Sequence, residues 1–182
     1  LCPVSRLKFF VFTATYTFFA NGQVDVTLEG DFDTRRMFLP RLGFTFCTEE
    51  MPFRYYGYGP LESYVDMHSG SRLGLYESSP EKEYVDYIMP QEHGNHYGTR
   101  YLEMGGFAFL AEQGFEFCVS QYSAEELTQK QHNFELVANG YANVRIDYKV
   151  SGIGSNSCGP KLAEQYRLQE EKVSFKFSIV KM

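Results

Sequence analysis

The segment from residue 173 to residue 180 reads VSFKFSIV, and its alternation of apolar and polar side chains decides the fold class. A period of two places the apolar set on one face of an extended strand and the polar set on the other. The apolar set is Val173, Phe175, Phe177 and Ile179. The polar set is Ser174, Lys176 and Ser178. We therefore predict a β-strand with one face in a core and the other in water.

The same alternation recurs in residues 23–28 and 143–150, and more weakly in 41–46 and 115–119. The inward-facing side chains expected in the two stronger stretches are Val24, Val26, Leu28, Val144, Ile146, Tyr148 and Val150. The opening stretch 7–19 fits a strand better than a secretion signal, because a basic leader and a small-residue cleavage site are both missing.

Turn-forming residues separate these stretches. The Asn-Gly pairs at residues 21–22 and 139–140 predict two tight hairpins, because both residue types tolerate positive φ. One short helix is predicted over Ser123–Gln131, where Ser123 and Glu126 would form a capping box. Many strands, one helix and no alternation of strands with helices predict an all-β, antiparallel sandwich. We treat residues 1–182 as a single domain.

Composition excludes several classes of partner. The 182 residues carry 17 Lys and Arg against 23 Asp and Glu, a net charge of -6. The cations are scattered, whereas binding to a phosphate backbone needs them clustered. No apolar run reaches the length of a membrane span. We therefore expect neither a nucleic acid nor a membrane as a partner.

Four cysteines are spread along the chain without a C-x-x-C pair: Cys2, Cys47, Cys118 and Cys158. An even count permits two disulfides with three possible connectivities. Cysteine is nevertheless far rarer here than in disulfide scaffolds, which favours free thiols in a reducing cytoplasm.

Titratable residues offer few specific signals. Five carboxylates lie near predicted turns or strand ends: Glu62, Asp66, Glu92, Glu103 and Asp147. Solvation at the surface is the default expectation for each. Glu92 is the most distinctive, and we expect it to accept backbone hydrogen bonds within the polar loop that it shares with His93. His93 and His96 have no further ligands at metal-site spacing, so we predict two polar loop residues and no metal.

The glycine-rich stretch Gly152–Pro160 starts like a dinucleotide-binding motif, but Ser157 replaces the third glycine and Pro160 prevents the helix that should follow. Two interpretations remain, a mere connection or a long loop that reaches another surface. Cys158 has no neighbouring cation or histidine in the sequence, so we favour a small lining residue over a nucleophile.

Taken together, five motifs occur in a characteristic order. They are RLG at 41–43, YGYGPLESYVD at 56–66, YIMPQEHG at 87–94 with GTR at 98–100, SQYS at 120–123 and GIGSNSCGP at 152–160. From about residue 13 to its end, the chain resembles the C-terminal domain of the large bacterial β-galactosidases of glycoside hydrolase family two, also called domain 5 or the small-chain domain.

This resemblance implies a β-supersandwich fold of the galactose mutarotase-like kind. It also implies a parent enzyme that hydrolyses terminal β-D-galactosides such as lactose with retention. In that family the catalytic glutamates lie on a separate barrel, so we expect this chain alone to be inactive. No cofactor is expected in this domain, although parent enzymes of the family often use Mg and Na ions. Leu1 falls part-way through the domain, which implies an N-terminal truncation.

By the same resemblance, the loop at 152–160 contributes to the rim of the active site. Its expected substrate-binding residues are Cys158, Asn156 and Ser157, with Glu92 and His93 in a second, polar loop. Many members of the family carry Trp at the position of Cys158. The implied partners are the other domains of the parent, above all the catalytic barrel, a galactoside substrate, and further copies in a homo-oligomer.

Two alternatives remain on the same fold. An aldose mutarotase or epimerase needs a general acid and a base, for which His93 or His96 with Glu92 is the sequence-local candidate. A carbohydrate-binding module would have to stack sugars on Tyr or Phe, because the chain contains no Trp.

Overall fold

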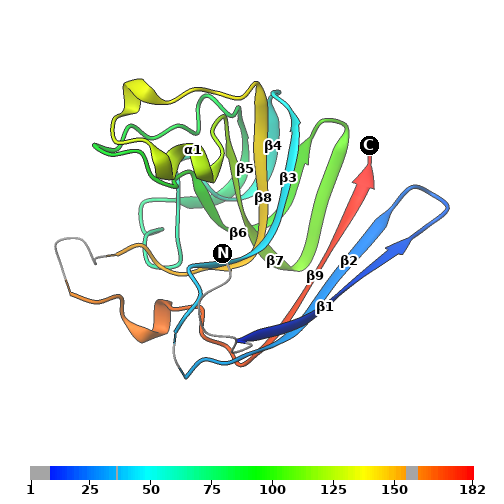
Figure 1. The fold of residues 1–182 in the computed structure, drawn as a ribbon. Coiled ribbons are helices and arrows are strands. Elements are labelled where there is room, and N and C mark those ends of the chain that lie inside the picture. Colours follow the sequence, from blue (N-terminus) through cyan, green and yellow to red (C-terminus); the bar gives the residue numbers. More distant parts are fainter. Residues whose placement is uncertain (1–8, 36, 155–159) are drawn as a thin grey trace.

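The structure, a computed structural model, describes residues 9–35, 37–154 and 160–182. Strands dominate these ranges (Figure 1). The nine strands are β1 (Phe10–Phe18), β2 (Val24–Phe32), β3 (Arg41–Glu49), β4 (Phe53–Gly59), β5 (Arg72–Ser78), β6 (Asn95–Met104), β7 (Phe107–Ser120), β8 (Tyr141–Val150) and β9 (Lys172–Lys181). The helical elements are α1 (Ala124–Gln129) and two 3₁₀ turns, η1 (Asn133–Glu135) and η2 (Glu164–Tyr166).

The strands form one large sheet in which the main path runs β1-β2-β9-β7-β6-β4-β5. The 14-residue strand β7 is the branch point. Its first residues pair with β9 and its last residues pair with β8, while β6 pairs along both parts. Strand β3 joins the sheet through β8. Every pairing between these strands is antiparallel, which confirms the predicted all-β, antiparallel class.

The decisive alternation appears as predicted. Along β9, Val173, Phe175 and Phe177 are buried while Ser174 and Lys176 are exposed. Cross-strand register transmits the pattern to β2, where Val26 lies opposite Phe177 and Leu28 opposite Phe175. Directly opposed side chains share a face of an antiparallel sheet, so the apolar residues of both strands face one core.

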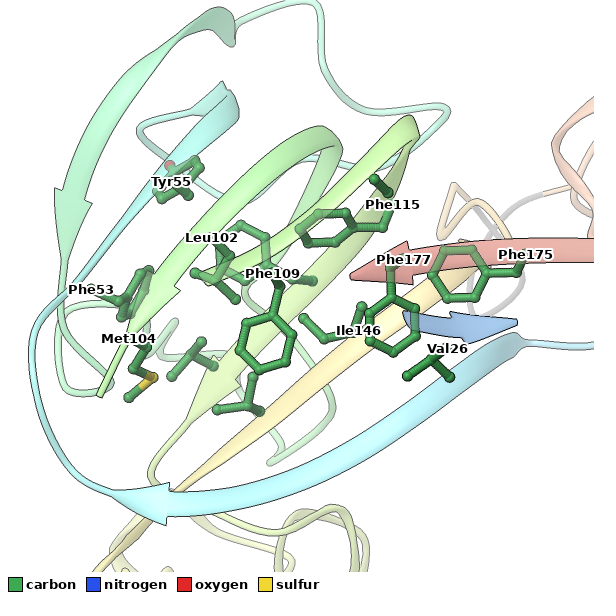
Figure 2. Packing of buried hydrophobic residues seen from close by; sticks show 14 of the residues in the cluster. Val26, Phe53, Tyr55, Leu102, Met104, Phe109, Phe115, Ile146, Phe175 and Phe177 are labelled. Atoms are coloured by element: carbon green, nitrogen blue, oxygen red, sulfur yellow. The ribbon is translucent and has the colours of Figure 1, made fainter. Parts of the chain in front are cut away.

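That core forms because the sheet curls back on itself. Phe44 on β3 packs edge-on against Phe177 on β9, with ring centroids 5.5 Å apart, although the two strands share no ladder. Phe46 and Phe109 are in contact at the same separation. Figure 2 shows this cluster, in which Phe109 and Phe177 lie between strands from different parts of the sheet. Strand β3 thus meets β7 and β9 through side chains, whereas β2 and β9, which are further apart in the sequence, pair through backbone hydrogen bonds.

The structure confirms one of the two predicted hairpins and the predicted helix. Asn21-Gly22 joins β1 to β2 in a hairpin, with Gly22 at φ 86°. The second predicted hairpin, at residues 139–140, is wrong: the chain before Gly140 contains α1 and η1, so no strand is available there to pair across the turn with β8. Helix α1 is shorter than expected at six residues.

Only half of the predicted capping box forms at α1. Ser123 Oγ accepts a hydrogen bond from Glu126 N at 3.1 Å, as a cap should. Glu126 instead turns its carboxylate to the amide of Val137, at 2.9 Å. The side chain thus ties the helix to the chain that leads into β8.

Strand β1 leaves part of the core face uncovered. Tyr16 and Phe18 lie opposite Val26 and Val24, so they stand on the same face as the core, yet they are 52% and 75% exposed. Among the described residues β1 pairs with β2 on one side only. In Figure 1 this hairpin extends away from α1. An apolar strand with an open edge is a typical site for further pairing or packing.

The core predicts a specific stability difference between two neighbouring residues. Replacing Phe177, which is 1% exposed, by Ala should lower the free energy of unfolding by roughly 3–5 kcal/mol, because a large ring is lost from a packed site. Lys176→Ala on the solvent face of the same strand is the matched control and should stay within about 0.5 kcal/mol. Urea unfolding monitored by circular dichroism measures both, and equal losses would contradict the assigned faces.

Candidate functional site

The glycine-rich loop is fixed at its beginning by Asp66. The amide of Ile153 donates to Asp66 Oδ1 at 3.1 Å, and the amide of Gly154 donates to Oδ2 at 2.6 Å. A Cβ atom at Gly152 would lie 2.5 Å from the Asp66 carboxylate, so only glycine permits this approach. Hydrogen bonds to an ionised carboxylate are strong. The 56–66 motif and the 152–160 motif are therefore two parts of one structure.

The tip of that loop, residues 155–159, lies outside the described residues, and with it Asn156, Ser157 and Cys158. Their predicted role at the rim of a sugar pocket stays a prediction. The structure instead describes the surface from which the loop starts.

This surface is a polar face of the sheet that loops cover. Register aligns Asn95 on β6 with Cys118 on β7, and Cys118 with Arg145 on β8. One step along, Glu116 on β7 lies opposite Asp147 on β8. On each strand the alternate side chains point into the core. From this alternation alone, the polar side chains on the opposite face would be expected to lie in water. Asn95, Glu116 and Asp147 are nevertheless buried.

Arg41 neutralises the row at the start of β3. Its Nη2 donates to Asp147 Oδ2, and its Nη1 donates to Glu92 Oε2 at 2.6 Å. Arg145 Nη1 meets the other oxygen of Glu92 at 2.7 Å. Gly43 leaves the space that the Asp147 carboxylate fills, because a Cβ atom there would collide with it. This explains why arginine and glycine stand two residues apart in the RLG motif.

Burial and charge act in opposite directions on the carboxyl groups of this cluster. Burial raises the pKa of Glu116 to about 7, against hydrogen bonds from Val150 N and Asn95 that lower it. Burial also raises the pKa of Asp147, and Arg41 opposes that rise. At Glu92, burial is outweighed by the hydrogen bond from Arg145 and the charge of Arg41, which hold the pKa below its usual range. Glu92 and the two arginines thus form a fixed charged network.

Two predictions about these carboxylates are wrong. Asp147 is not solvated at the surface but 2% exposed, because Arg41 replaces its water. Glu92 binds two arginine side chains, whereas it was expected to accept backbone hydrogen bonds. Backbone amides near the loop instead donate to other carboxylates: Ile153 N to Asp66, Gly94 N to Glu62 at 2.8 Å and Val150 N to Glu116 at 3.1 Å. Sequence reasoning missed Arg41 and Glu116 as members of the site; the RLG spacing was the available signal for Arg41.

His93 lies in the loop before β6, whereas His96 lies on β6 and not in a loop as predicted; both are buried. His96 is 0% exposed; its Nδ1 lies 3.1 Å from Tyr58 O and its Nε2 lies 2.7 Å from Glu83 Oε2. His93 is also buried, with Nδ1 at 2.7 Å from Gln91 O. With both nitrogens engaged inside the protein, His96 is not placed to exchange a proton with a substrate. Of the two candidate pairs for epimerase chemistry, His93 or His96 with Glu92, the geometry therefore disfavours the one with His96.

Glu92 and His93 separate two cavities. The larger, of about 220 Å³, extends to the start of the glycine-rich loop at Gly152 and Ile153. The smaller, of about 100 Å³, extends to α1. Cys118 lines both, and its Sγ donates to His93 O at 3.1 Å. Burial raises the pKa of this thiol to about 11, so it is not a thiolate nucleophile.

The ion pairs of Glu92 with Arg41 and Arg145 are better suited to holding the loop in place than to acid–base catalysis. Glu92 is held ionised by two arginines, which suits neither a proton donor nor a nucleophile that must leave its partners. Within the described ranges no three His, Cys, Asp or Glu side chains are grouped to hold a metal.

Fold and site together define a class: an antiparallel β domain with a network of ion pairs on one face of its sheet and a glycine-rich segment that starts beside it. The chain belongs to a known family of this kind. The family model described as "Beta galactosidase small chain" matches residues 3–179.

Individual relatives agree with this assignment. The chain is 41% identical over 182 residues to a β-galactosidase from Actinobacillus pleuropneumoniae, an alignment that covers 99% of this chain and 18% of that protein. It is 34% identical over 173 residues to a β-galactosidase from Staphylococcus xylosus, covering 92% and 17%. It is 32% identical over 191 residues to one from Kluyveromyces lactis, covering 98% and 18%. The chain thus spans less than a fifth of the length of these relatives.

In the described ranges, no helix combines the length and the apolar character that crossing a bilayer requires.

The raised pKa of Glu116 predicts a pH-dependent stability. Between pH 4.5, its ordinary value, and pH 7 the folded chain binds more protons at this group than the unfolded chain does. The free energy of unfolding that this proton uptake contributes is therefore fully present below pH 4.5. It is lost as the pH rises through the folded-state pKa of about 7. The loss should be on the order of 3 kcal/mol.

Glu116→Gln does not titrate and should lack this decline, even if the substitution lowers stability at every pH. Urea unfolding at pH 4.5, 5.5, 6.5 and 7.5 tests the difference between the curves. Glu112→Gln, at an exposed position of the same strand, is the control and should keep the decline. Parallel curves for the wild type and Glu116→Gln would contradict the assignment.

Proposed function

We propose that this chain is the non-catalytic C-terminal domain of a β-galactosidase that hydrolyses terminal β-D-galactosides such as lactose. The observation that carries the proposal is the family match across residues 3–179, in relatives that are more than five times as long. The remaining four-fifths of such a protein supply the catalytic glutamates, on a separate barrel. This chain supplies a structural support and one loop.

The open edge at β1 supports association with the rest of the parent. Phe12, Tyr16 and Phe18 are each more than half exposed on the core face of the sheet. Further strands packed there would bury them and extend the curled sheet into a β-supersandwich of the galactose mutarotase-like kind. The proposed partners are thus the other domains of the β-galactosidase, the barrel foremost, within a homo-oligomeric parent. The free thiols of Cys47 and Cys118 agree with a cytoplasmic location.

We assign the loop that begins at Gly152 to the rim of the active site, with Cys158, Asn156 and Ser157 as its substrate-binding residues. The support is the anchored base of the loop. Two amides bound to one carboxylate fix the direction in which the chain leaves the sheet. A loop that must reach a neighbouring cavity benefits from such a rigid base, because order before binding lowers the entropic cost of binding.

The first experiment separates the domain from an independent enzyme. The purified chain should release no chromophore from an aryl β-galactoside above the buffer rate. The same chain, substituted for the matching segment of the Actinobacillus pleuropneumoniae β-galactosidase, should give an active enzyme, whereas deletion of that segment should not. Turnover by the chain alone would overturn the proposal, and so would a folded but inactive chimera.

A second experiment tests the rim assignment in the active chimera. A non-hydrolysable galactose analogue should slow alkylation of Cys158 by iodoacetamide, because bound sugar covers the thiol. Cys47, exposed on β3, serves as the internal control and should react at the same rate with and without the analogue. Peptide mass spectrometry reads both sites in one sample. Unchanged alkylation of Cys158 at saturating analogue would remove Cys158 from the rim.

A further inference from the structure

Strand β1 is an edge of the sheet, and its outer side has no strand partner among the described residues. Its register with β2 runs without interruption from Phe10 opposite Phe32 to Phe18 opposite Val24. In Figure 1 it is the first, dark blue strand, at the end of the sheet away from α1. A regular strand with one bare side exposes a row of backbone donors and acceptors.

The two ends of the hairpin identify the backbone groups on that bare side. The amide of Asp33 donates to Phe9 O at 2.8 Å, and the amide of Phe19 donates to Gln23 O at 2.9 Å. Residues of an antiparallel strand direct their N–H and C=O groups to alternate sides, so the odd-numbered residues of β1 bond to β2. The even-numbered residues direct theirs outward: Phe10, Phe12, Ala14, Tyr16 and Phe18.

The sequence of β1 reads almost the same in both directions from Ala14. Residues 10–18 are FVFTATYTF, so a threonine, an aromatic residue and a further aromatic residue recur at matching distances on either side. When two copies pair antiparallel about Ala14, Phe12 of each lies opposite Tyr16 of the other, and Phe10 lies opposite Phe18. These are the outward-bonding residues, so the free backbone groups and the aromatic rings match in one register. Aromatic cross-strand pairs stabilise such a ladder.

Strand β1 also lacks the features that normally protect a sheet edge. Edge strands of natural proteins commonly carry charged residues, proline or a bulge, which prevent pairing with another chain. At the other sheet edges of the described residues, β5 carries Arg72 and Glu77. Strand β3 carries Arg41 and Glu49. The segment 10–18 contains no charged residue, no proline and no glycine.

We propose that two copies of this chain associate through β1, in an antiparallel pairing about Ala14 that joins their sheets into one continuous sheet across a two-fold axis. The partner that fits this edge is an uncharged aromatic strand with the reversed sequence pattern, and β1 of a second copy is such a strand. The inference does not rest on the proposed function. Parent strands packed on the core face of β1 leave this pairing possible, because the face and the edge of a strand are different surfaces.

Sedimentation velocity of the full 182-residue chain at about 1 to 100 µM tests the proposal. We expect a monomer–dimer equilibrium with a Kd of about 1–50 µM, because a single strand pair is a small interface. Thr13→Lys combined with Thr15→Lys should raise the Kd at least about tenfold, because Thr13 of each copy lies opposite Thr15 of the other and like charges there repel. Both threonines are exposed. Leu73→Lys combined with Leu75→Lys, at exposed positions of the edge strand β5, is the matched control and should dimerise like the wild type.

A charge exchange tests the register independently. Thr13→Glu combined with Thr15→Glu should also be monomeric by itself, whereas an equimolar mixture with the lysine variant should form a heterodimer, because each lysine then lies opposite a glutamate. A wild-type chain that is monomeric at about 100 µM would overturn the proposal. So would open-ended aggregates in place of a dimer, full dimerisation of the lysine variant, or a mixture that forms no heterodimer. The readout is mass and not galactoside turnover, so failure of this inference and failure of the proposed function are distinguishable.

Discussion

The two ion pairs of Arg41 are the interaction on which the rest of the site depends. They connect the start of β3 to Asp147 on β8, 106 residues away, and to Glu92 in the loop before β6, 51 residues away. A buried charge is stable only when it is fully paired, since desolvation of an unpaired ion costs several kcal/mol. Arg41, Glu92, Asp147 and Arg145 therefore have to assemble together. Once assembled, they hold the loop before β6 against the sheet, where Glu92 lines both cavities.

This network exists because the sheet is buried on both faces near β7. One face of β7 carries Phe115, Phe117 and Val119 into the aromatic core, and the other carries Glu116 and Cys118 beneath the loops. A face that is covered but polar must satisfy its own hydrogen bonds. The carboxylates and arginines do this with each other. The charge pairing and the loop packing are thus consequences of the same arrangement.

The predictions from sequence were correct where the outcome depended on local patterns. The alternation in β9 and β2, the first Asn-Gly hairpin and the Ser123 cap depend on residues within a few positions of one another. It failed where a distant partner changed the outcome. Asp147 was predicted to be a surface carboxylate because its partner Arg41 lies on another strand. The turn at Asn139-Gly140 does not form a hairpin, because helical segments and not a strand precede it. His96 was predicted to be a polar loop residue, but it lies buried on β6, where its ring nitrogens meet Tyr58 O and Glu83.

The amino-acid sequence by itself determined the strand content, the antiparallel class, the aromatic core residues of β9 and the family resemblance. All of these follow from short-range periodicity and from motifs that keep their order along the chain. Only the tertiary structure decided that Asp66 anchors the start of the glycine-rich loop, that Glu92 lies between two arginines, and that Asn95 and Arg41 are among the residues lining one cavity. The physical reason is that burial and ion pairing depend on which residues are close in space, and the curl of the sheet determines which residues those are.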